Sequence, residues 1–340
     1  MTQAAAAIRR RTVVWMAGAG AIAVVLAVVS SLPPQQQRPR AEVGEAVLPG
    51  FGANAPKVGL VMVTTSEETY HLVHNSEGWV IAEKGSFPVD AERVAELTRA
   101  LTAIKYARAM TRDDKKFDRI GLGDPAKGGT GALLEVGDGN GNNFAKLIVG
   151  YRDGRSYVRA PDDLQAWAVD GATLPPLQRG ARWADLDVVG IAPDQLLDVQ
   201  VRPSGAPAYR LVPADASGQQ FNLAPPYASR RVLASFAPTL TATALSRLAP
   251  IDVAPASSIA SGAPASQYIA RTRAGVAVIV QAWRSHDRGW VTIGAATDES
   301  ATAEARADAE AINKRAAGWA FALTELDWGA FATPLAALVE

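Results

Sequence analysis

The fold is decided by residues 57–81, which read KVGLVMVTTSEETYHLVHNSEGWVI. Apolar runs rich in β-branched residues occupy 57–65 and 69–74, and a third run begins at Trp79. Polar turn residues separate the three runs. Short apolar runs joined by tight polar turns are typical of neighbouring β-strands. The stretch therefore predicts the first three strands of an antiparallel sheet.

A helix is predicted immediately after these strands, between residues 89 and 106. Apolar residues recur there at helical spacing, at Val94, Leu97, Leu101 and Ile104. Asp90 stands at the start of this pattern, where a carboxylate can accept from free backbone N–H groups. The helix is expected to cover the apolar face of the sheet.

The same order of elements recurs in the second half of the chain. Strands are predicted at 197–202, 208–213 and 220–224. When the two copies are aligned, Tyr209 corresponds to Tyr70. We therefore expect an internal duplication.

A second helix is predicted at 227–248, after the third strand of the second copy. Its apolar positions are Leu233, Phe236, Leu240 and Leu248. Pro238 is expected to kink or interrupt this helix, because proline has no backbone N–H.

Each copy continues with four more predicted strands. They lie at 132–137, 143–151, 154–160 and 164–170 in the first copy, and at 267–275, 276–283, 289–295 and 318–326 in the second. The Asp153-Gly154 dipeptide between two of them favours a two-residue hairpin. A charged, alanine-rich segment at 299–315 is predicted to be a surface helix.

These patterns predict an α+β fold: an N-terminal transmembrane helix followed by two similar units, each an antiparallel sheet meander with a covering helix. The first unit is expected at residues 57–185 and the second at 186–340. Residues 1–34 are predicted to form a cytoplasmic tip and a membrane anchor. The stretch 35–56 is rich in proline, glutamine and glycine, which is typical of a linker.

The anchor is predicted from residues 12–32, which carry no charge. About 20 apolar residues at ~1.5 Å each cross a hydrocarbon core of ~30 Å. Basic residues before such a span hold the N-terminus in the cytoplasm. The residues expected to matter for anchoring are Arg9, Arg10, Arg11, Trp15, Gly18 and Gly20.

A cleaved signal peptide is the alternative interpretation of this segment. The apolar part of a signal peptide usually has ~7–15 residues and is shorter than this one. Either interpretation places the bulk of the chain outside the cytoplasm. We expect the chain in a bacterial inner membrane, with the N-terminus cytoplasmic and the rest periplasmic.

Composition excludes several classes of site. Lys plus Arg and Asp plus Glu number 34 each, so the net charge is zero and a nucleic-acid partner is not expected. The chain has no cysteine, which excludes disulfides, thiolate metal sites and a cysteine nucleophile. It has only three histidines, so few residues are available to build a histidine-based metal or catalytic site.

Two polar stretches invite a binding-site hypothesis and have a simpler explanation. The glycine-rich stretch 121–131 lacks the lysine and hydroxyl that complete a phosphate loop, so an ordinary loop or hairpin is expected. His71 and His74 are three residues apart on a predicted strand. They should therefore point to opposite faces, which disfavours a shared metal ion.

Ser285, His286 and Asp287 are the residue types of a catalytic triad. Neighbouring side chains are expected to point apart, so a polar hairpin loop is the preferred interpretation. A mixed charge run follows the first helix, and it is either a solvated loop or a partner-facing patch. The patch would comprise Asp113, Asp114, Lys115, Lys116 and Arg119. No catalytic residue, cofactor or metal ligand is predicted.

Several short stretches form a recognisable pattern: Ile120-GLGDP, Ala132-LLEVG, Leu147-IVG and Ser156-YVRA, and Arg182-Trp183 before a strand near Val199. In this pattern the chain resembles the bacterial family named domain of unknown function 4340. The resemblance implies an auxiliary envelope protein similar to the extracytoplasmic part of gliding-motility-type ABC transporter subunits. The family implies no catalytic residues.

The leading hypothesis is a non-enzymatic accessory protein. Its span would dock on an integral membrane partner within the lipid bilayer, such as a transporter permease or accessory subunit. The alternative is a periplasmic module that binds a small molecule, glycan or peptide in a groove between the two repeats. A third hypothesis, an envelope hydrolase, lacks a recognisable constellation of catalytic groups.

Overall fold

The computed structural model describes residues 41–299 and 301–340. The predicted anchor residues, Arg9 to Gly20, lie outside the described residues. Within the part described, no helix combines the length and the apolar character needed to span a bilayer. The chain divides into two compact units. Of the described residues, one unit contains 41–59 and Arg99–Leu174, and the other contains Leu60–Thr98 and Pro175–Glu340.

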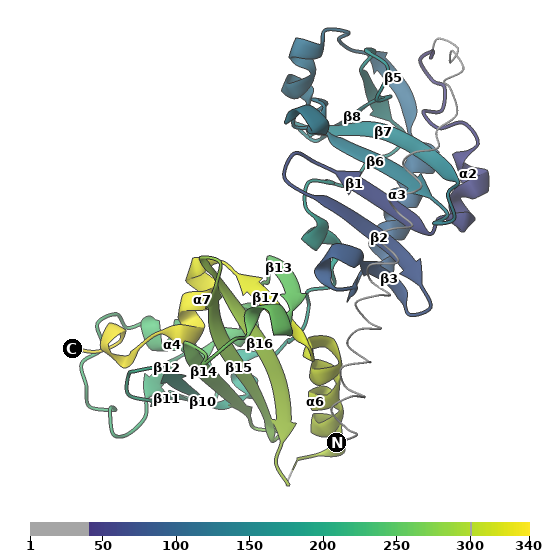
Figure 1. Ribbon diagram of the computed structural model, residues 1–340. Helices are drawn as coiled ribbons and strands as arrows, with labels where there is room; N and C mark the ends of the chain where they lie inside the picture. The colour runs from purple at the N-terminus through teal and green to yellow at the C-terminus, as the bar shows by residue number, and fades with distance from the viewer. Residues whose placement is uncertain (1–40, 300) are drawn as a thin grey trace, which may run out of the picture. The chain divides into compact units, whose positions relative to one another are not determined.

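The strands form two antiparallel sheets (Figure 1). The strands of the first are β1 Leu60–Thr64, β2 Thr69–Asn75, β3 Gly78–Ile81, β4 Phe87–Pro88, β5 Lys105–Ala109, β6 Ala132–Gly137, β7 Asn143–Arg152, β8 Arg155–Arg159 and β9 Trp167–Asp170. Their order in the sheet is β4-β3-β2-β1-β6-β7-β8-β9-β5.

The strands of the second sheet are β10 Leu196–Pro203, β11 Tyr209–Pro213, β12 Phe221–Leu223, β13 Asp252–Pro255, β14 Ser266–Thr272, β15 Val276–Ser285, β16 Arg288–Thr297 and β17 Trp319–Leu323. Their order is β12-β11-β10-β14-β15-β16-β17-β13. The α-helices among the described residues are α2 Phe51–Asn54, α3 Ala91–Ala103, α4 Ala237–Ala242, α5 Ala256–Ile259, α6 Ala303–Ala316 and α7 Glu325–Ala332.

The two sheets repeat one topology. In both, three successive strands form a hairpin series, the next part of the chain contains a helix, and one strand then joins the far edge. That edge strand is β5 in the first sheet and β13 in the second, and four further strands complete each sheet. Only the short strand β4 has no counterpart. The two sheets are therefore similar antiparallel sheets, as an internal duplication predicts, although neither is a simple meander.

Matching hairpins support the correspondence. Asp153 and Gly154 join β7 to β8 with φ angles of 49° and 74°. His286 and Asp287 join β15 to β16 with φ angles of 51° and 56°. Two left-handed residues between paired strands are the mark of a type I′ turn. Both turns were predicted as hairpin loops, and both predictions are confirmed.

Helix α3 forms where the sequence predicted a helix, but it is shorter than the predicted 89–106. Its apolar positions are 0–2% exposed: Val94, Leu97, Leu101 and, just beyond its end, Ile104. The Asp90 carboxylate accepts from the backbone N–H of Glu92 at 3.0 Å, which caps the first turn. The helix ends at Ala103, and the residues after it form β5.

The helix predicted at 227–248 is wrong in extent and orientation. Only α4 and the short 3-10 turn Leu245–Arg247 form there. Pro238 is the second residue of α4 and lies in its first turn, where a missing N–H costs nothing. The predicted helix is therefore interrupted before Ala237, and α4 is not kinked at Pro238. Leu233, Phe236 and Leu240 are 55%, 63% and 41% exposed and do not face the core.

The predicted linker also differs, because its last part is folded. Val47 and Phe51 are only 4% and 2% exposed, and the backbone N–H of Val47 donates to Ile104 at 3.1 Å. A spacer that buries nothing was expected up to residue 56. Apolar side chains within that stretch account for the difference.

More than one helix covers the second sheet. Phe331 of α7 lies edge-on to Tyr268, with ring centroids 5.0 Å apart. The Tyr268 hydroxyl donates to the carbonyl of Ala242 in α4 at 2.7 Å. On the opposite face, Trp283 and Trp290 pack with Ile259 of α5. One covering helix per copy was predicted, so this part of the prediction is corrected.

Helix α6 packs against the part of β16 that does not pair with β17. Strand β17 pairs with β16 only as far as Thr292. Beyond that point the Asn313 side chain accepts from the Ala295 N–H and donates to the Ala295 carbonyl, both at 2.8 Å. The predicted surface helix at 299–315 is thus confirmed, with bounds of Ala303–Ala316.

Candidate functional site

The glycine-rich stretch forms a compact loop between β5 and β6. The whole loop begins at Asp113 and contains two 3-10 turns, Asp114–Ile120 and Pro125–Lys127, and a strand follows it. A phosphate loop would lead into a helix. The predicted interpretation as an ordinary loop is confirmed. Residues 113–131 form the signature loop.

Asp118 holds the two ends of the signature loop together. Its Oδ1 accepts from both the backbone N–H and the hydroxyl of Thr130, at 2.8 and 2.9 Å. The backbones also meet closely, since a Cβ on Gly129 would lie 2.4 Å from the carbonyl carbon of Gly123. The glycines of the stretch therefore serve close backbone packing.

Arg159 fastens the signature loop to β8. Its side chain is buried, and its Nε donates to the Leu122 carbonyl at 3.1 Å. Its Nη1 donates to the carbonyl of Pro161 at 2.9 Å, and the guanidinium lies 4.7 Å from the ring centre of Phe117. Burial lowers the pKa of Arg159, while nearby carboxylates, Asp124 foremost, oppose that shift.

The predicted charge run lies on the first 3-10 turn of the signature loop. Asp114, Lys115, Lys116 and Arg119 are exposed, whereas Phe117 between them is buried. Asp113 caps the turn by accepting from the Lys115 N–H at 3.2 Å. Hydrogen bonding from Lys116 lowers the pKa of Asp113, with Lys116 Nζ 3.0 Å from its Oδ2. The run is thus an exposed charged surface on an anchored turn, and its role as a partner-facing patch stays a prediction.

The two histidines of β2 take different partners. His71 pairs through Nδ1 with Glu83, and the backbone N–H of His71 donates to Glu83 at 2.8 Å. Burial alone would raise the pKa of Glu83, but these bonds lower it overall. The His74 ring packs against Trp79 at 5.3 Å. Among the residues that the structure describes, no cluster of three metal-ligating side chains occurs.

One expectation about the Ser285-His286-Asp287 stretch is wrong. Neighbouring side chains were expected to point apart, yet Ser285 Oγ lies 2.9 Å from His286 Nδ1. The left-handed backbone of the type I′ turn brings these two groups together. Both His286 and Asp287 are exposed at the hairpin tip.

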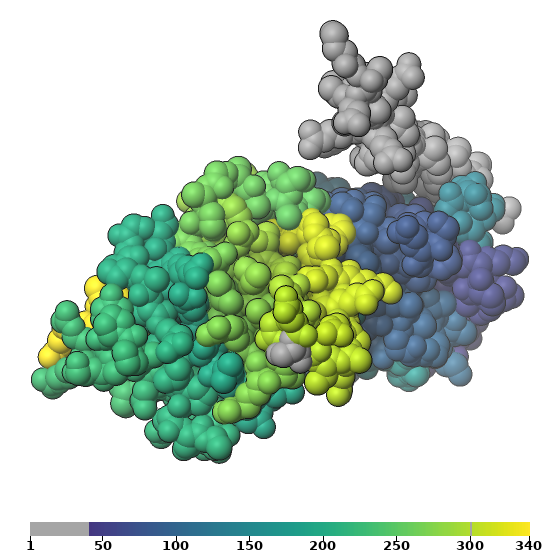
Figure 2. Space-filling view, turned by 90° about the horizontal axis from the view of Figure 1, so that it is seen from below, coloured from purple at the N-terminus to yellow at the C-terminus, as the bar shows by residue number. Residues whose placement is uncertain are grey.

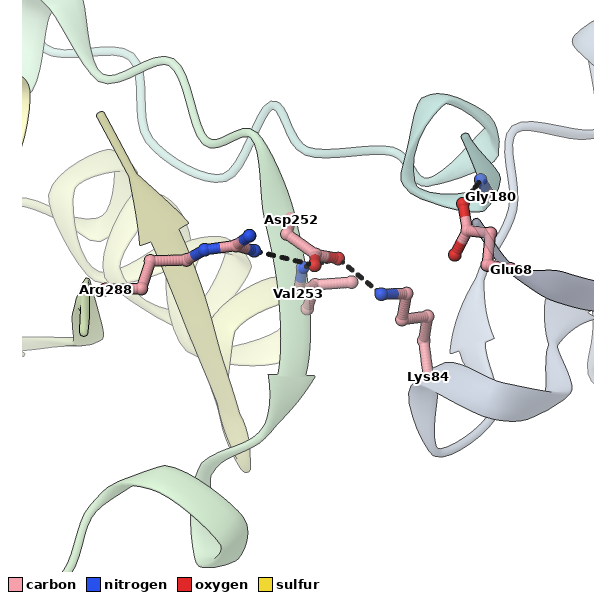
Figure 3. A network of polar contacts seen from close by, with 6 residues as sticks. All are labelled: Glu68, Lys84, Gly180, Asp252, Val253 and Arg288. Carbon is pink, nitrogen blue, oxygen red and sulfur yellow. Dashed lines mark hydrogen bonds and ion pairs between the residues drawn. The ribbon is translucent and has the colours of Figure 1, made fainter. Parts of the chain in front are cut away.

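A charge network, shown in Figure 3, involves residues that the sequence did not single out. Asp252 at the start of β13 contacts Lys84 at 2.7 Å and Arg288 at 3.2 Å. The side chains of Lys84 and Asp252 are only 19% and 18% exposed. The same figure shows Glu68, which accepts from the Gly180 N–H at 2.7 Å. Residues this far apart in sequence leave no local signal.

Close apolar packing surrounds this network. The ring of Phe87 lies edge-on to that of Trp319, with centroids 4.9 Å apart. A Cβ on Gly85 would lie 2.6 Å from Pro255. Lys84, Asp252 and Arg288 therefore join well-packed parts of one compact unit, where an ion pair is less screened than on an open surface.

The apolar stripe, defined as Leu233, Phe236 and Leu240, is the largest departure from the sequence prediction. The backbone N–H of Leu240 donates to the Phe236 carbonyl at 2.9 Å, so these two lie one helical turn apart on the same side of α4. The buried side of the helix contains Pro238, Thr241 and Ala242. A sequence signal existed, because proline at the first turn of a helix leaves the residues before it outside the helix.

Comparison with protein families identifies the chain. A family model described as Domain of unknown function (DUF4340) matches residues 79–262. The chain belongs to the DUF4340 family. The DUF4340 match includes the whole signature loop, Arg159, the Lys84–Asp252 pair and the apolar stripe. Comparison with curated proteins and with solved structures finds no match.

Proposed function

We propose that this DUF4340 chain is a non-catalytic accessory protein anchored in the bacterial inner membrane, with most of its mass in the periplasm. It docks on an ABC-type transporter or on another membrane complex of the envelope. The observation that supports this proposal is the construction of the signature loop, in which Asp118 and Arg159 bind their own loop and leave charged neighbours exposed.

The chemistry of the loop favours docking over catalysis. Catalytic groups converge on a space where a reacting atom can sit. Asp118 and Arg159 instead direct their polar atoms at Thr130, Leu122 and Pro161. A turn held in this way loses little conformational freedom when a partner binds, which favours affinity.

The family resemblance adds the class of partner. The signature residues are those that suggested similarity to gliding-type ABC transporter auxiliary proteins. The uncharged run at 12–32 supports placement beside an integral membrane protein. Exposed charges of both signs at Asp114, Lys115 and Arg119 suit a polar interface that sets orientation and association rate.

The test is capture of the tagged full-length chain from native membranes after mild crosslinking, read by mass spectrometry. We expect a permease or accessory subunit of an ABC-type transporter. Charge reversal by Lys115→Glu with Lys116→Glu should reduce its recovery. The matched control is Arg152→Glu with Arg155→Glu, which makes the same charge change at the exposed β7–β8 turn.

Equal recovery with both double variants would contradict docking through the signature loop. Capture of no transporter component would remove the proposed partner. A thermal-shift screen with envelope sugars and peptides would then test the alternative, a ligand-binding module, because a bound ligand raises the unfolding temperature.

A further inference from the structure

The apolar stripe is a fixed part of the surface. The backbone N–H of Leu233 donates to the Leu338 carbonyl at 2.8 Å, and Val232 forms a bridge with Val339. Figure 2 shows yellow C-terminal residues beside green ones from the middle of the chain. The exposed side chains of Leu233, Phe236 and Leu240 therefore project from a backbone that is held on its other side.

The surroundings of the stripe are basic. Residues 216–251 contain Arg230, Arg231 and Arg247 and no aspartate or glutamate. All three arginines are exposed, and Arg247 Nη2 donates to the carbonyl of Leu240 at 2.6 Å, so its charge lies beside the stripe. The acidic neighbour is Glu340, whose carboxylate is 3.5 Å from Arg231 and whose backbone carbonyl accepts from Arg230.

We propose that the apolar stripe and its arginines form a contact site for the surface of an anionic lipid bilayer. Apolar and aromatic side chains flanked by arginine match the two layers of a membrane interface, acyl chains below and anionic headgroups above. Single apolar residues scattered on a surface need no explanation, whereas exposed apolar residues that gather on one part of the surface mark a candidate contact site.

Charge and tether favour the bilayer over a protein partner. The arginines complement anionic headgroups without needing a shaped partner surface. The uncharged run that predicts the anchor ends at residue 32, and the described structure begins at residue 41. At ~3.5 Å per residue, so short a connection keeps the folded part near the bilayer. This inference rests on the membrane location in the proposed function.

The absence of cysteine from the chain allows a direct test. The variant Phe236→Cys carries one thiol, to which an environment-sensitive fluorophore is attached. The full-length protein is placed in nanodiscs of phosphatidylglycerol with phosphatidylcholine, or of phosphatidylcholine alone. We expect a blue-shifted label that lipid-borne quenchers reach in the anionic discs. Leu240→Cys repeats the measurement at a second stripe position.

Two comparisons make the test specific. The variant Ala274→Cys labels an exposed turn between β14 and β15 and should show no lipid contact. Adding Arg231→Gln to Phe236→Cys should lower the ratio of bound to free stripe roughly fivefold, as expected for one cation near an anionic surface. Quenching should also weaken at high salt.

Labels at positions 236 and 240 that lipid quenchers never reach would overturn the proposal. Crosslinking of the same positions to a protein in native membranes would then assign the stripe to a protein partner. Lipid contact at these positions without capture of any transporter would support the bilayer contact site and contradict the proposed transporter partner. A chain that does not remain in the membrane fraction would remove the location on which both rest.

Discussion

Tyr70 of β2 and Tyr209 of β11 occupy matching places in the two sheets and make the same hydrogen bond. The Tyr70 hydroxyl donates to the Leu177 carbonyl and the Tyr209 hydroxyl to the Thr333 carbonyl, both at 2.8 Å. Each carbonyl lies in the segment that follows the strand of its sheet that comes last along the chain, which is β9 in the first sheet and β17 in the second. The repeated bond thus ties the end of each copy back to an early strand.

Removing either hydroxyl should destabilise the protein. Tyr70→Phe leaves the Leu177 carbonyl and the indole N–H of Trp183 without their shared partner, and should cost about 2–3 kcal/mol. Tyr209→Phe loses one bond and should cost about 1–2 kcal/mol. Urea unfolding measures both. Tyr151→Phe, at an exposed position, is the control, and equal stability of all three variants would contradict the argument.

Stability should fall at alkaline pH. Burial raises the pKa of Tyr70 and of Tyr209 above the usual value near 10, although the bond from Trp183 opposes the shift at Tyr70. The stabilisation is therefore complete below about pH 10 and is lost as pH rises beyond it, since only the unfolded chain ionises there. Unfolding midpoints measured on both sides of about pH 10 should show this loss.

The double variant Tyr70→Phe with Tyr209→Phe should lose less of its remaining stability over the same range. Tyr268 retains part of the dependence, because its pKa is also raised by burial. An identical pH dependence in the wild type and the double variant would rule out these two hydroxyls as its source.

Arg159 should matter far more to stability than an ordinary surface arginine. Arg159→Met removes the donors for the carbonyls of Leu122 and Pro161, and should cost about 2–4 kcal/mol. Arg152→Met changes the same residue type at an exposed site and should stay within about 0.5 kcal/mol. Denaturant unfolding compares the two variants. A loss of unfolding free energy no larger than that of the control would show that the loop does not depend on Arg159.

The Lys84–Asp252 pair should be coupled more strongly than an exposed pair. A double-mutant cycle with Lys84→Met and Asp252→Asn should give about 1 kcal/mol, because both side chains are largely covered. The Lys116–Asp113 pair has a similar contact distance, 3.0 Å, but is exposed, and should give less than about 0.5 kcal/mol. Similar coupling energies in the two cycles would mean that burial has no influence here.

Substitutions in the apolar stripe should leave folding almost unchanged. Phe236→Ser should alter the unfolding free energy by less than about 0.5 kcal/mol, because the ring is already in contact with solvent. Leu97→Ala in α3 should cost about 2–5 kcal/mol, since Leu97 is fully buried. Thermal and urea unfolding distinguish the cases. A large loss of unfolding free energy from Phe236→Ser would show that Phe236 is packed in the core, as the helical pattern suggested.

Local patterns were sufficient to predict most of the strands. Apolar alternation marked β1, β2 and the strands of the later hairpins, and Asp153-Gly154 marked a turn whose backbone is left-handed at both residues. The match of Tyr70 with Tyr209 from spacing alone agrees with their identical hydrogen bonds. Such features follow from side-chain periodicity and turn chemistry.

Other features depend on contacts distant in sequence. The edge strand β5 reads KYARA and has no buried residue, so nothing in its pattern separates it from the end of α3. The stripe residues have helical spacing, yet α4 begins only at Ala237, so Leu233 and Phe236 lie before it. The Lys84–Asp252 pair was not predictable, because the two residues stand 168 positions apart in the sequence and only the fold brings them together.

The pairing of Asn313 with Ala295 has a consequence for how molecules of this chain meet one another. A strand edge with free N–H and carbonyl groups is a template on which a strand of another molecule can form. The amide of Asn313 imitates a backbone peptide and occupies both groups of Ala295. Helix α6 thereby covers β16 beyond Thr292, where β17 no longer pairs with it, and Ala295 has no free backbone group to offer a strand of another molecule.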